Sequence, residues 1–198
     1  MTKAILLVIA GCNGSGKSTF SKDISAGNFE PFDYDIHFLR NYSSLLDIDI
    51  KDKMAHNMTW QELENQVEEA IKSKSNFCYE TNFNSSPLYW PQIFKDNGYE
   101  IRMAFLCLNS IEEAIKRVAI RVQNGGHFVP ESEIRKRYYE GFENLNSCYL
   151  FFDSIDLFDT SFYGELPKFI LSIEKDKRPF ISSIPNYLKE LILPSFYS

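Results

Sequence analysis

The sequence predicts an α/β fold of the P-loop type: a mostly parallel sheet of about five strands with helices on both faces. Three observations predict it. Apolar runs of strand length alternate with segments of helical periodicity along the chain. The apolar run at 4–10 is unbroken, as is typical of a strand covered on both faces, and a glycine-rich turn follows it. The chain has 198 residues, of which 44% are apolar and 24% are charged, so a single domain over 1–198 accounts for its length and composition.

Each element has a local signal. Strands are expected where short apolar runs lie between turn residues, at 4–10, 29–34, 76–79, 100–108 and 154–159. Helices are expected at 17–25, 59–73, 88–97, 111–124 and 130–144. Capping boxes that begin at Thr59 and Ser110 predict two helix starts, and Gly98 and the Gly125-Gly126 pair predict two helix ends.

Two parts of the chain carry weaker signals. The stretch 41–57 is polar and irregular, and we expect either helix or loop there. The part from 162 to 198 contains aromatic residues and prolines and includes the apolar segment 187–193. We expect 162–198 to be a docking segment that packs on the core, in part as a helix.

The composition argues against several classes of function. The net charge is −6, from 21 Lys and Arg against 27 Asp and Glu, and an acidic chain is poorly suited to an extended nucleic-acid or membrane surface. No apolar run approaches the about 18 residues of a membrane span. The four cysteines form no CxxC pair and no zinc-type spacing, so we expect buried thiols in a reducing compartment and a cytoplasmic protein.

One motif predicts the chemistry. The residues at 11–18 fit the pattern G-x-x-x-x-G-K-[ST] directly after the first strand. Its glycines let backbone N–H groups wrap a phosphate, and the helix that follows adds its positive end. Lys17 is expected to reach the β- and γ-phosphates of ATP or GTP, and Ser18 to ligate Mg²⁺. The predicted nucleotide site is formed by Gly11, Cys12, Asn13, Gly14, Ser15, Gly16, Lys17, Ser18 and Thr19.

Carboxylates at predicted strand ends are candidates for the other half of a phosphotransfer site. Ligands of parallel α/β sheets bind at the carboxyl ends of the strands, where Asp35 and Glu80 fall. A small-molecule kinase needs a carboxylate that orients the acceptor hydroxyl and takes its proton. Asp35 is our candidate for this general base, with Asp33 as a competitor and a solvated loop aspartate as the alternative. Glu80 is expected to hold Mg²⁺ through water or to bind the acceptor, unless it is a surface acid.

A predicted lid over about 117–140 carries basic residues. Arg117 and Arg121 lie one helical turn apart and away from the apolar face, and Arg135 lies on the next helix. Mobile arginines can neutralise the charge of a phosphoryl group during transfer. Arg121 and Arg135 are our candidates for that role, and a solvated basic face is the alternative. His127 is expected to structure the lid rather than to act as a base.

Together these segments resemble the zeta-toxin-like family of P-loop kinases. The resemblance covers about 4–160, and its most specific part is Gly-Gly-His-x-Val-Pro at 125–130. The residues that carry it are the P-loop with Ser18-Thr19, the Asp35 segment, Tyr79-Glu80-Thr81-Asn82, the run from Arg117 to Pro130, and Ile134-Arg135-Lys136-Arg137-Tyr138. The chain departs from the family at Cys12, where Pro is common, and at Asn82, where Thr is common; the second departure leaves the acceptor open.

The resemblance implies a function and a set of roles. It implies transfer of the γ-phosphoryl group of ATP or GTP, with Mg²⁺, to a sugar hydroxyl of UDP-N-acetylglucosamine or a related nucleotide sugar. A toxic member of the family would have an antitoxin protein as its partner. The implied roles are phosphates and metal for Lys17 and Ser18, general base for Asp35, acceptor binding for Glu80 and Thr81, and phosphoryl transfer for Arg121 and Arg135. Arg117 and His127 are our further candidates for substrate contacts.

Two other functions stay open at this point. The chain could be a kinase of a nucleoside, a sugar or a polynucleotide end, although its acidic charge counts against long nucleic acids. A nucleotide-dependent switch ATPase or GTPase would need an Asp-ending Walker B strand, an Asn-Lys-x-Asp motif or an ABC signature. The sequence contains none of these, so a kinase is the leading prediction.

Overall fold

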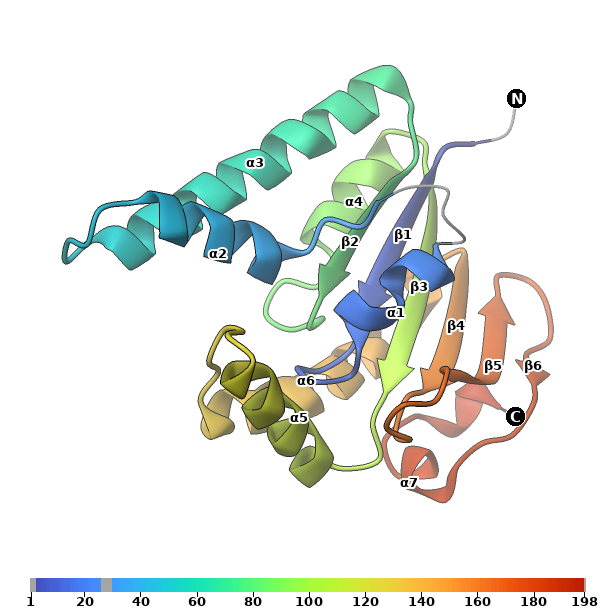
Figure 1. The fold of residues 1–198 in the computed structure, drawn as a ribbon. Helices are drawn as coiled ribbons and strands as arrows, with labels where there is room; N and C mark the ends of the chain where they lie inside the picture. The colour runs from blue at the N-terminus through green and yellow to red at the C-terminus, as the bar shows by residue number, and fades with distance from the viewer. Residues whose placement is uncertain (1–2, 26–29, 198) are drawn as a thin grey trace.

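The structure is a computed structural model that describes residues 3–25 and 30–197 (Figure 1). Within the described part, one six-stranded sheet has the strand order β2-β1-β3-β4-β5-β6. The first four strands along the chain are parallel, and the last two continue the sheet in antiparallel orientation. The strands are β1 (Ile5–Ala10), β2 (Phe77–Thr81), β3 (Glu100–Cys107), β4 (Ser154–Asp159), β5 (Lys168–Glu174) and β6 (Phe180–Ile181). The predicted α/β fold with a mostly parallel sheet is confirmed.

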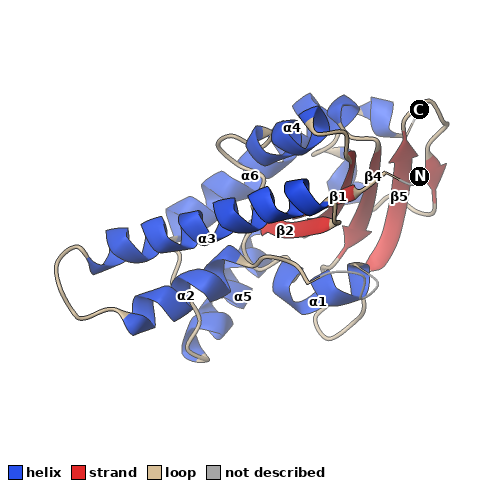
Figure 2. Cartoon of the chain, turned by 90° about the horizontal axis from the view of Figure 1, so that it is seen from above, coloured by secondary structure: helices blue, strands red, loops and turns tan. Residues whose placement is uncertain are grey.

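Helices surround this sheet unevenly (Figure 2). They are α1 (Lys17–Ile24), α2 (Tyr34–Ser44), α3 (Lys51–Ser73), α4 (Tyr89–Asp96), α5 (Ile111–Gln123), α6 (Glu131–Cys148) and α7 (Asn186–Lys189), with 3-10 turns at Tyr149–Phe151 and Pro194–Phe196. Seen from above, α1 lies on one side of the sheet, and α4 and α6 lie on the other. The hairpin of α2 and α3 extends well beyond the strands.

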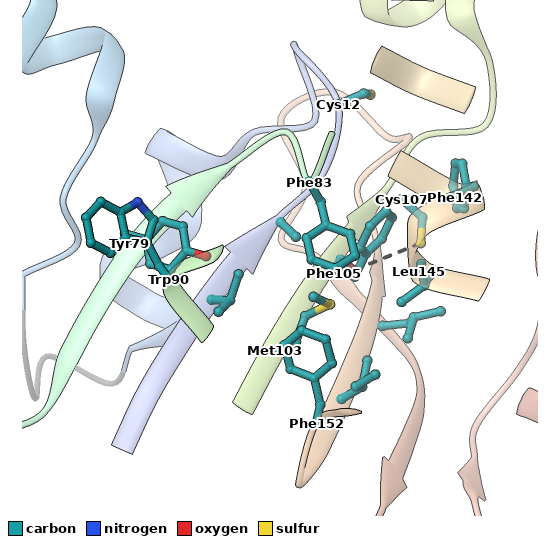
Figure 3. Close-up of a cluster of buried hydrophobic side chains, with 14 of the residues drawn as sticks. Cys12, Tyr79, Phe83, Trp90, Met103, Phe105, Cys107, Phe142, Leu145 and Phe152 are labelled. Carbon is teal, nitrogen blue, oxygen red and sulfur yellow. Dashed lines mark hydrogen bonds between the residues drawn. The ribbon is translucent and has the colours of Figure 1, made fainter. Parts of the chain in front are cut away.

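The apolar core lies mainly between the sheet and the helices α3, α4 and α6 (Figure 3). In this layer Phe105 of β3 packs against Phe142 of α6, with ring centres 5.3 Å apart. The opposite face of the sheet carries a smaller cluster, in which Ile24 of α1 packs with Ile9 and Leu106. Successive side chains of a strand point to opposite faces. The unbroken apolar run of β1 therefore supplies both layers and holds the loop that follows it.

The carboxyl ends of the central parallel strands meet at one edge of the sheet. Ala10 at the end of β1 pairs in register with Thr81 of β2 and with Phe105 of β3. The glycine-rich loop leaves β1 at this edge, and β2 ends there with Glu80 and Thr81. Ligands of such sheets bind at this edge, so the fold brings the predicted site residues of β1 and β2 together.

The predicted helix start at Thr59 is wrong. Helix α3 begins at Lys51, and Thr59 is completely buried within it. Its hydroxyl donates to the carbonyl oxygen of Ala55 and accepts a hydrogen bond from Asn41 of α2. This contact between helices uses the side chain that the capping box would need. At Ser110 the predicted helix start is confirmed, because the hydroxyl accepts a hydrogen bond from the backbone N–H of Glu113 in the first turn of α5; the Glu113 carboxylate pairs with Arg117.

The predicted strand at 29–34 is reduced to one bridge. Position 29 lies outside the described residues, and Phe32 pairs with Tyr79 of β2. The carboxylate of Asp33 then accepts hydrogen bonds from two backbone N–H groups and caps α2. Because the cap starts a helix immediately, Asp35 lies in a first helical turn and not at a strand end.

Tertiary contacts organise both segments with weak sequence signals. The stretch 41–57 contains the end of α2, a loop and the start of α3, so the helical option is correct for most of it. The part from 162 to 198 adds β5 and β6 to the sheet, and only its last portion is helical. Leu188 and Phe196 of that portion are completely buried, which docks it on the core. No helix in the described ranges is long and apolar enough to span a membrane.

Candidate active site

The loop between β1 and α1 has a backbone that glycine favours. Gly11, Gly14 and Gly16 have φ angles of 148°, 80° and 86°, which other residues rarely adopt. A Cβ atom at Gly11 would lie 2.6 Å from the carbonyl oxygen of Leu106, and one at Gly14 would lie 2.9 Å from that of Ala114. These glycines are therefore required by the packing of β3 and α5 around the loop.

Several hydrogen-bond donors of this loop have no partner within the described residues. The backbone N–H groups of Gly14, Gly16, Lys17 and Ser18 make no hydrogen bond there, and the hydroxyl of the buried Ser15 also lacks a partner. Helix α1 begins at this point and adds the positive end of its dipole. Unpaired donors around a helix N-terminus suit a phosphate group.

Lys17 is held by three oxygen atoms. Its Nζ donates to the carbonyl oxygens of Gly11 at 2.8 Å and Cys12 at 3.1 Å, and to Oδ1 of Asn82 at 3.1 Å. Burial lowers the pKa of Lys17. All three N–H groups of the ammonium are in use, so a phosphate oxygen must replace at least one of these acceptors.

Two carboxylates converge on Ser18. The Ser18 hydroxyl lies 2.5 Å from Oδ2 of Asp33 and 2.9 Å from Oε2 of Glu80. Burial raises the pKa of Glu80, and the charge of Asp33 raises it further. Asp33 entered the sequence prediction only as a competitor for the base. Its position beside the end of β2 follows from the bridge between Phe32 and Tyr79, which only the tertiary structure shows.

Replacing Glu80 by Gln tests this electrostatic arrangement. A carboxyl with a raised pKa favours the folded state below its ordinary pKa of 4.5, and this contribution is lost as the pH rises through the raised value. We therefore expect E80Q to raise the melting temperature of the ligand-free protein at pH 7, and to raise it less near pH 5. Thermal unfolding at both pH values measures this, with E68Q on the exposed face of α3 as the control. An E80Q protein less stable than the wild type at pH 7 would contradict the prediction.

Asp33 and Asp35 face different partners although they are two residues apart. Oδ1 of Asp33 accepts from the Asp35 backbone N–H at 2.9 Å, while its other oxygen meets Ser18. Oδ2 of Asp35 lies 3.2 Å from the guanidinium of Arg121 on α5, and the Asp35 side chain is 43% exposed. Asp33 is thus fixed on the P-loop side, and Asp35 bridges α2 to the predicted lid.

The turn after α5 holds Arg121 in this position. Its guanidinium also donates to the carbonyl oxygen of His127 at 3.0 Å. A Cβ atom at Gly126 would lie 2.5 Å from Cγ of Arg121, so the arginine passes over a position where only glycine leaves room. The ring of His127 packs edge-on against Phe38 of α2, with ring centres 5.3 Å apart. These contacts agree with a structuring part for His127.

Arg117 fastens α5 to the P-loop. It donates to Glu113 at 2.8 Å, to the carbonyl oxygen of Gly14 at 3.4 Å and to that of Ser161 at 3.0 Å. Only 11% of its side chain is exposed. The structure therefore places Arg117 between the P-loop and the segment after β4, and not beside Asp35.

The structure does not bring Arg135 to the site. Its guanidinium pairs with Glu131 at 2.8 Å and Glu112 at 3.7 Å on the exposed side of α6. Arg137 lies two positions further along the helix and points elsewhere, because side chains two apart do not share a helix face. Its guanidinium reaches Oδ1 of Asn13 in the P-loop at 3.3 Å. Arg137 is thus the arginine of α6 that contacts the P-loop, a contact that the choice of Arg135 missed.

One cavity of about 600 Å³ joins these groups. The P-loop residues that line it are Asn13, Gly14, Gly16, Lys17, Ser18 and Thr19, whereas Gly11, Cys12 and Ser15 do not. Asp33, Asp35 and Arg121 line one part, and the end of β2 contributes Glu80, Thr81 and Asn82. A segment after β4, at 160–166, supplies a wall that the sequence did not predict.

A phosphate cradle, a lysine, a hydroxyl and paired acids at the carboxyl edge of a parallel sheet define a P-loop kinase. The chain belongs to the zeta toxin family, whose model matches residues 2–157. It is 27% identical over 132 residues to an uncharacterized protein of Haemophilus influenzae, a match that covers 65% of this chain and 88% of the relative.

Solved structures share the fold. The structure of the PezAT chromosomal toxin-antitoxin system of Streptococcus pneumoniae matches with a TM-score of 0.63 and 17% identity, over 97% of this chain and 79% of that one. The structure of AvrRxo1-ORF1:-ORF2 with ATP matches with a TM-score of 0.62 and 14% identity, over 87% of this chain and 59% of that one. At these identities the likeness concerns the fold alone.

Proposed function

We propose that this kinase transfers the γ-phosphoryl group of ATP or GTP to a hydroxyl of a nucleotide sugar such as UDP-N-acetylglucosamine. The observation that carries the kinase chemistry is the shared cavity, in which Lys17 and Ser18 face Asp35 and Arg121. The nucleotide sugar rests on membership of the zeta toxin family. Positioning and charge neutralisation would supply most of the catalysis.

The donor side of the cavity suits a nucleoside triphosphate with Mg²⁺. The hydroxyl of Ser18 and the carboxylates of Asp33 and Glu80 are the hard oxygen ligands that Mg²⁺ prefers. The raised pKa of Glu80 supports this assignment, because a cation would relieve the repulsion between the two acids. Bound there, Mg²⁺ would neutralise charge on the β- and γ-phosphates. Among the described residues no cluster of three or more His, Cys, Asp and Glu could hold a metal alone.

On the acceptor side, Asp35 is our proposed general base. Its carboxylate lines the cavity and is not engaged by Ser18, unlike that of Asp33. An acceptor hydroxyl that displaced Arg121 from Asp35 would leave the guanidinium free to neutralise the transferring phosphoryl group. Thr81 lines the same cavity and is a proposed acceptor contact. The transfer role assigned to Arg135 stays a prediction, and Arg137 is the better placed arginine of α6.

An exposed aromatic side chain in the cavity lining suits the base of the donor nucleotide. Tyr163 is 75% exposed and its ring centre lies 5.9 Å from the guanidinium of Arg117. Stacking on an aromatic ring is worth about 1–3 kcal/mol per base. We expect Y163A to raise KM for ATP by roughly fivefold or more, with kcat nearly unchanged.

Steady-state kinetics with varied ATP measures the effect of Y163A. The matched control is Y139A, because Tyr139 is also exposed, at 52%, but lies on α6 outside the cavity. If Y163A left the KM unchanged for both ATP and GTP, the nucleobase of the donor would not stack on Tyr163.

The proposed reaction is tested by incubation with Mg²⁺-ATP and a panel of acceptors. The panel contains UDP-sugars, free sugars, nucleosides and an oligonucleotide with a 5′-hydroxyl, and mass spectrometry detects an added phosphate. We expect a phosphorylated UDP-sugar. A phosphate added only to one of the other acceptors would replace the nucleotide sugar and keep the kinase, whereas hydrolysis without transfer to any acceptor would contradict a kinase.

A protein partner and a compartment belong to the same proposal. The fold is shared with the PezAT toxin-antitoxin system, and on that likeness we propose an antitoxin-type partner that inhibits the kinase.

The cysteines at 12, 78, 107 and 148 are free thiols, and burial raises the pKa of Cys12 to about 11. Unreactive buried thiols suit a reducing compartment, which supports a cytoplasmic location.

A further inference from the structure

Asn82 is a cavity residue to which the proposed chemistry assigns no role. Its Oδ1 accepts a hydrogen bond from Nζ of Lys17 at 3.1 Å. The other two acceptors of this ammonium are carbonyl oxygens of Gly11 and Cys12, which belong to the P-loop itself. Within the described residues, Asn82 is thus the acceptor that ties Lys17 to a second element, the end of β2.

The backbone around Asn82 is held firmly by α6. Nδ2 of Asn144 donates to the carbonyl oxygen of Phe83 at 2.8 Å. Phe83 is completely buried and has a φ angle of 55°. A Cβ atom at Gly141 would lie 3.2 Å from the carbonyl oxygen of Asn82, so helix and loop are in close contact. The amide of Asn82 therefore extends into the cavity from a rigid support.

The number of donors on Lys17 defines what this amide does during catalysis. An ammonium group has three N–H bonds, and contacts to a β- and a γ-phosphate oxygen need two of them. The bonds to Gly11 and Cys12 come from the loop that wraps the phosphate, and phosphate oxygens can take their place. The bond to Asn82 can persist, because its acceptor lies on a different element.

We propose that Asn82 is a positioning residue that keeps one N–H of Lys17 while the other two turn to the phosphates. This inference rests on the proposed kinase function. A neutral acceptor suits the task, since Asp33, Asp35 and Glu80 already surround the cavity with acids. A carboxylate in place of this amide would compete with the phosphates for the charge of Lys17, whereas an amide orients the ammonium and leaves its charge available.

The test compares N82L, which has a similar size but no acceptor, with N82Q, which restores a neutral carbonyl oxygen. Two rates are measured for each: transfer to the acceptor, and phosphate release from Mg²⁺-ATP without an acceptor. We expect N82L to lower both rate constants about tenfold or more, as for loss of a hydrogen bond to a charged group. KM for ATP should change less than about threefold, because the backbone cradle binds the ground state. N82Q should recover part of the lost kcat.

The matched control is N84L, because Asn84 lies in the same loop but outside the cavity, and its side chain bonds only to Ser85 among the residues that the structure describes. Melting temperatures of all variants verify folding. The inference is overturned if N82L keeps its kcat, if N82Q is no better than N82L, or if the loss appears only in KM for the acceptor. If the wild type releases phosphate but phosphorylates no acceptor, the proposed function is contradicted. The phosphate-release rates of N82L and N82Q then still test the role of Asn82. A wild type with neither reaction would overturn both.

Discussion

Replacing Asp35 by Ala is expected to lower phosphoryl transfer at least 10²-fold while ATP binding stays within about threefold of wild type. A positioned general base contributes about 10²–10⁴-fold to such a reaction. Within the described residues, the Asp35 carboxylate pairs with Arg121 and makes no hydrogen bond to Ser18 or Lys17, so the donor side keeps its contacts. The pair with Arg121 is partly exposed, and its loss should cost no more than about 1 kcal/mol of stability. Transfer kinetics and calorimetry with a non-hydrolysable ATP analogue measure the two effects.

The comparison of D35A with D33N decides which acid acts as the base. Asp33 contacts Ser18, so D33N should weaken Mg²⁺-dependent ATP binding, whereas Asn is an equally good cap and should keep the start of α2. D47A, at the fully exposed tip of the α2–α3 hairpin, is the control. If D35A kept full transfer activity while D33N lost it with ATP binding intact, the base would be Asp33.

Replacing Lys17 by Ala is expected to abolish transfer, with a loss of roughly 10³-fold or more in kcat/KM. Its ammonium is the cation that the P-loop supplies to the transferring phosphoryl group, and such electrostatic contacts count for most in a site shielded from water. The ligand-free fold should survive, because Lys17 lies at the cavity and not in the apolar core. Kinetics at saturating ATP and thermal unfolding measure the two quantities.

A second lysine of the same helix is the control for K17A. Lys22 lies on α1 with 75% of its side chain exposed and pairs with Glu30 at 3.0 Å. K22A should therefore keep wild-type transfer. A K17A protein that still transferred phosphate at a tenth of the wild-type rate would remove Lys17 from the centre of the mechanism.

Elements with complete local signals were predicted well. The helix predicted at 111–124 is observed as α5, and it buries Ile111, Ala114 and Val118 at helical spacing. Thr59 carries a box as good as the one at Ser110, yet its hydroxyl is used in a contact with Asn41 of α2. The sequence alone does not say which of two side-chain contacts is made, because the competing partner lies on another helix.

The residues of the candidate site also fall into two groups: those that a local pattern predicts, and those whose roles depend on contacts with other elements. The P-loop is continuous in the chain, so its pattern was sufficient to predict it. The roles of Asp33 and Asp35 depend on a helix cap, which turns one carboxylate to Ser18 and leaves the other to Arg121. The segment 160–166 joins the cavity because β4 pairs in parallel with β3, and Arg117 connects Ser161 to Gly14 of the P-loop; no local pattern marks this segment.

By itself, the sequence determined a nucleotide site, a mostly parallel α/β sheet and a kinase-like set of acids and arginines. These follow from residue spacing, which local backbone geometry converts directly into strands, turns and helix ends. Only the tertiary structure decided that Asp33 meets Ser18, that Arg137 and not Arg135 reaches the P-loop, and that Asn82 holds Lys17. Each of these contacts joins residues from different elements, and their distances are set by how the helices pack on the sheet.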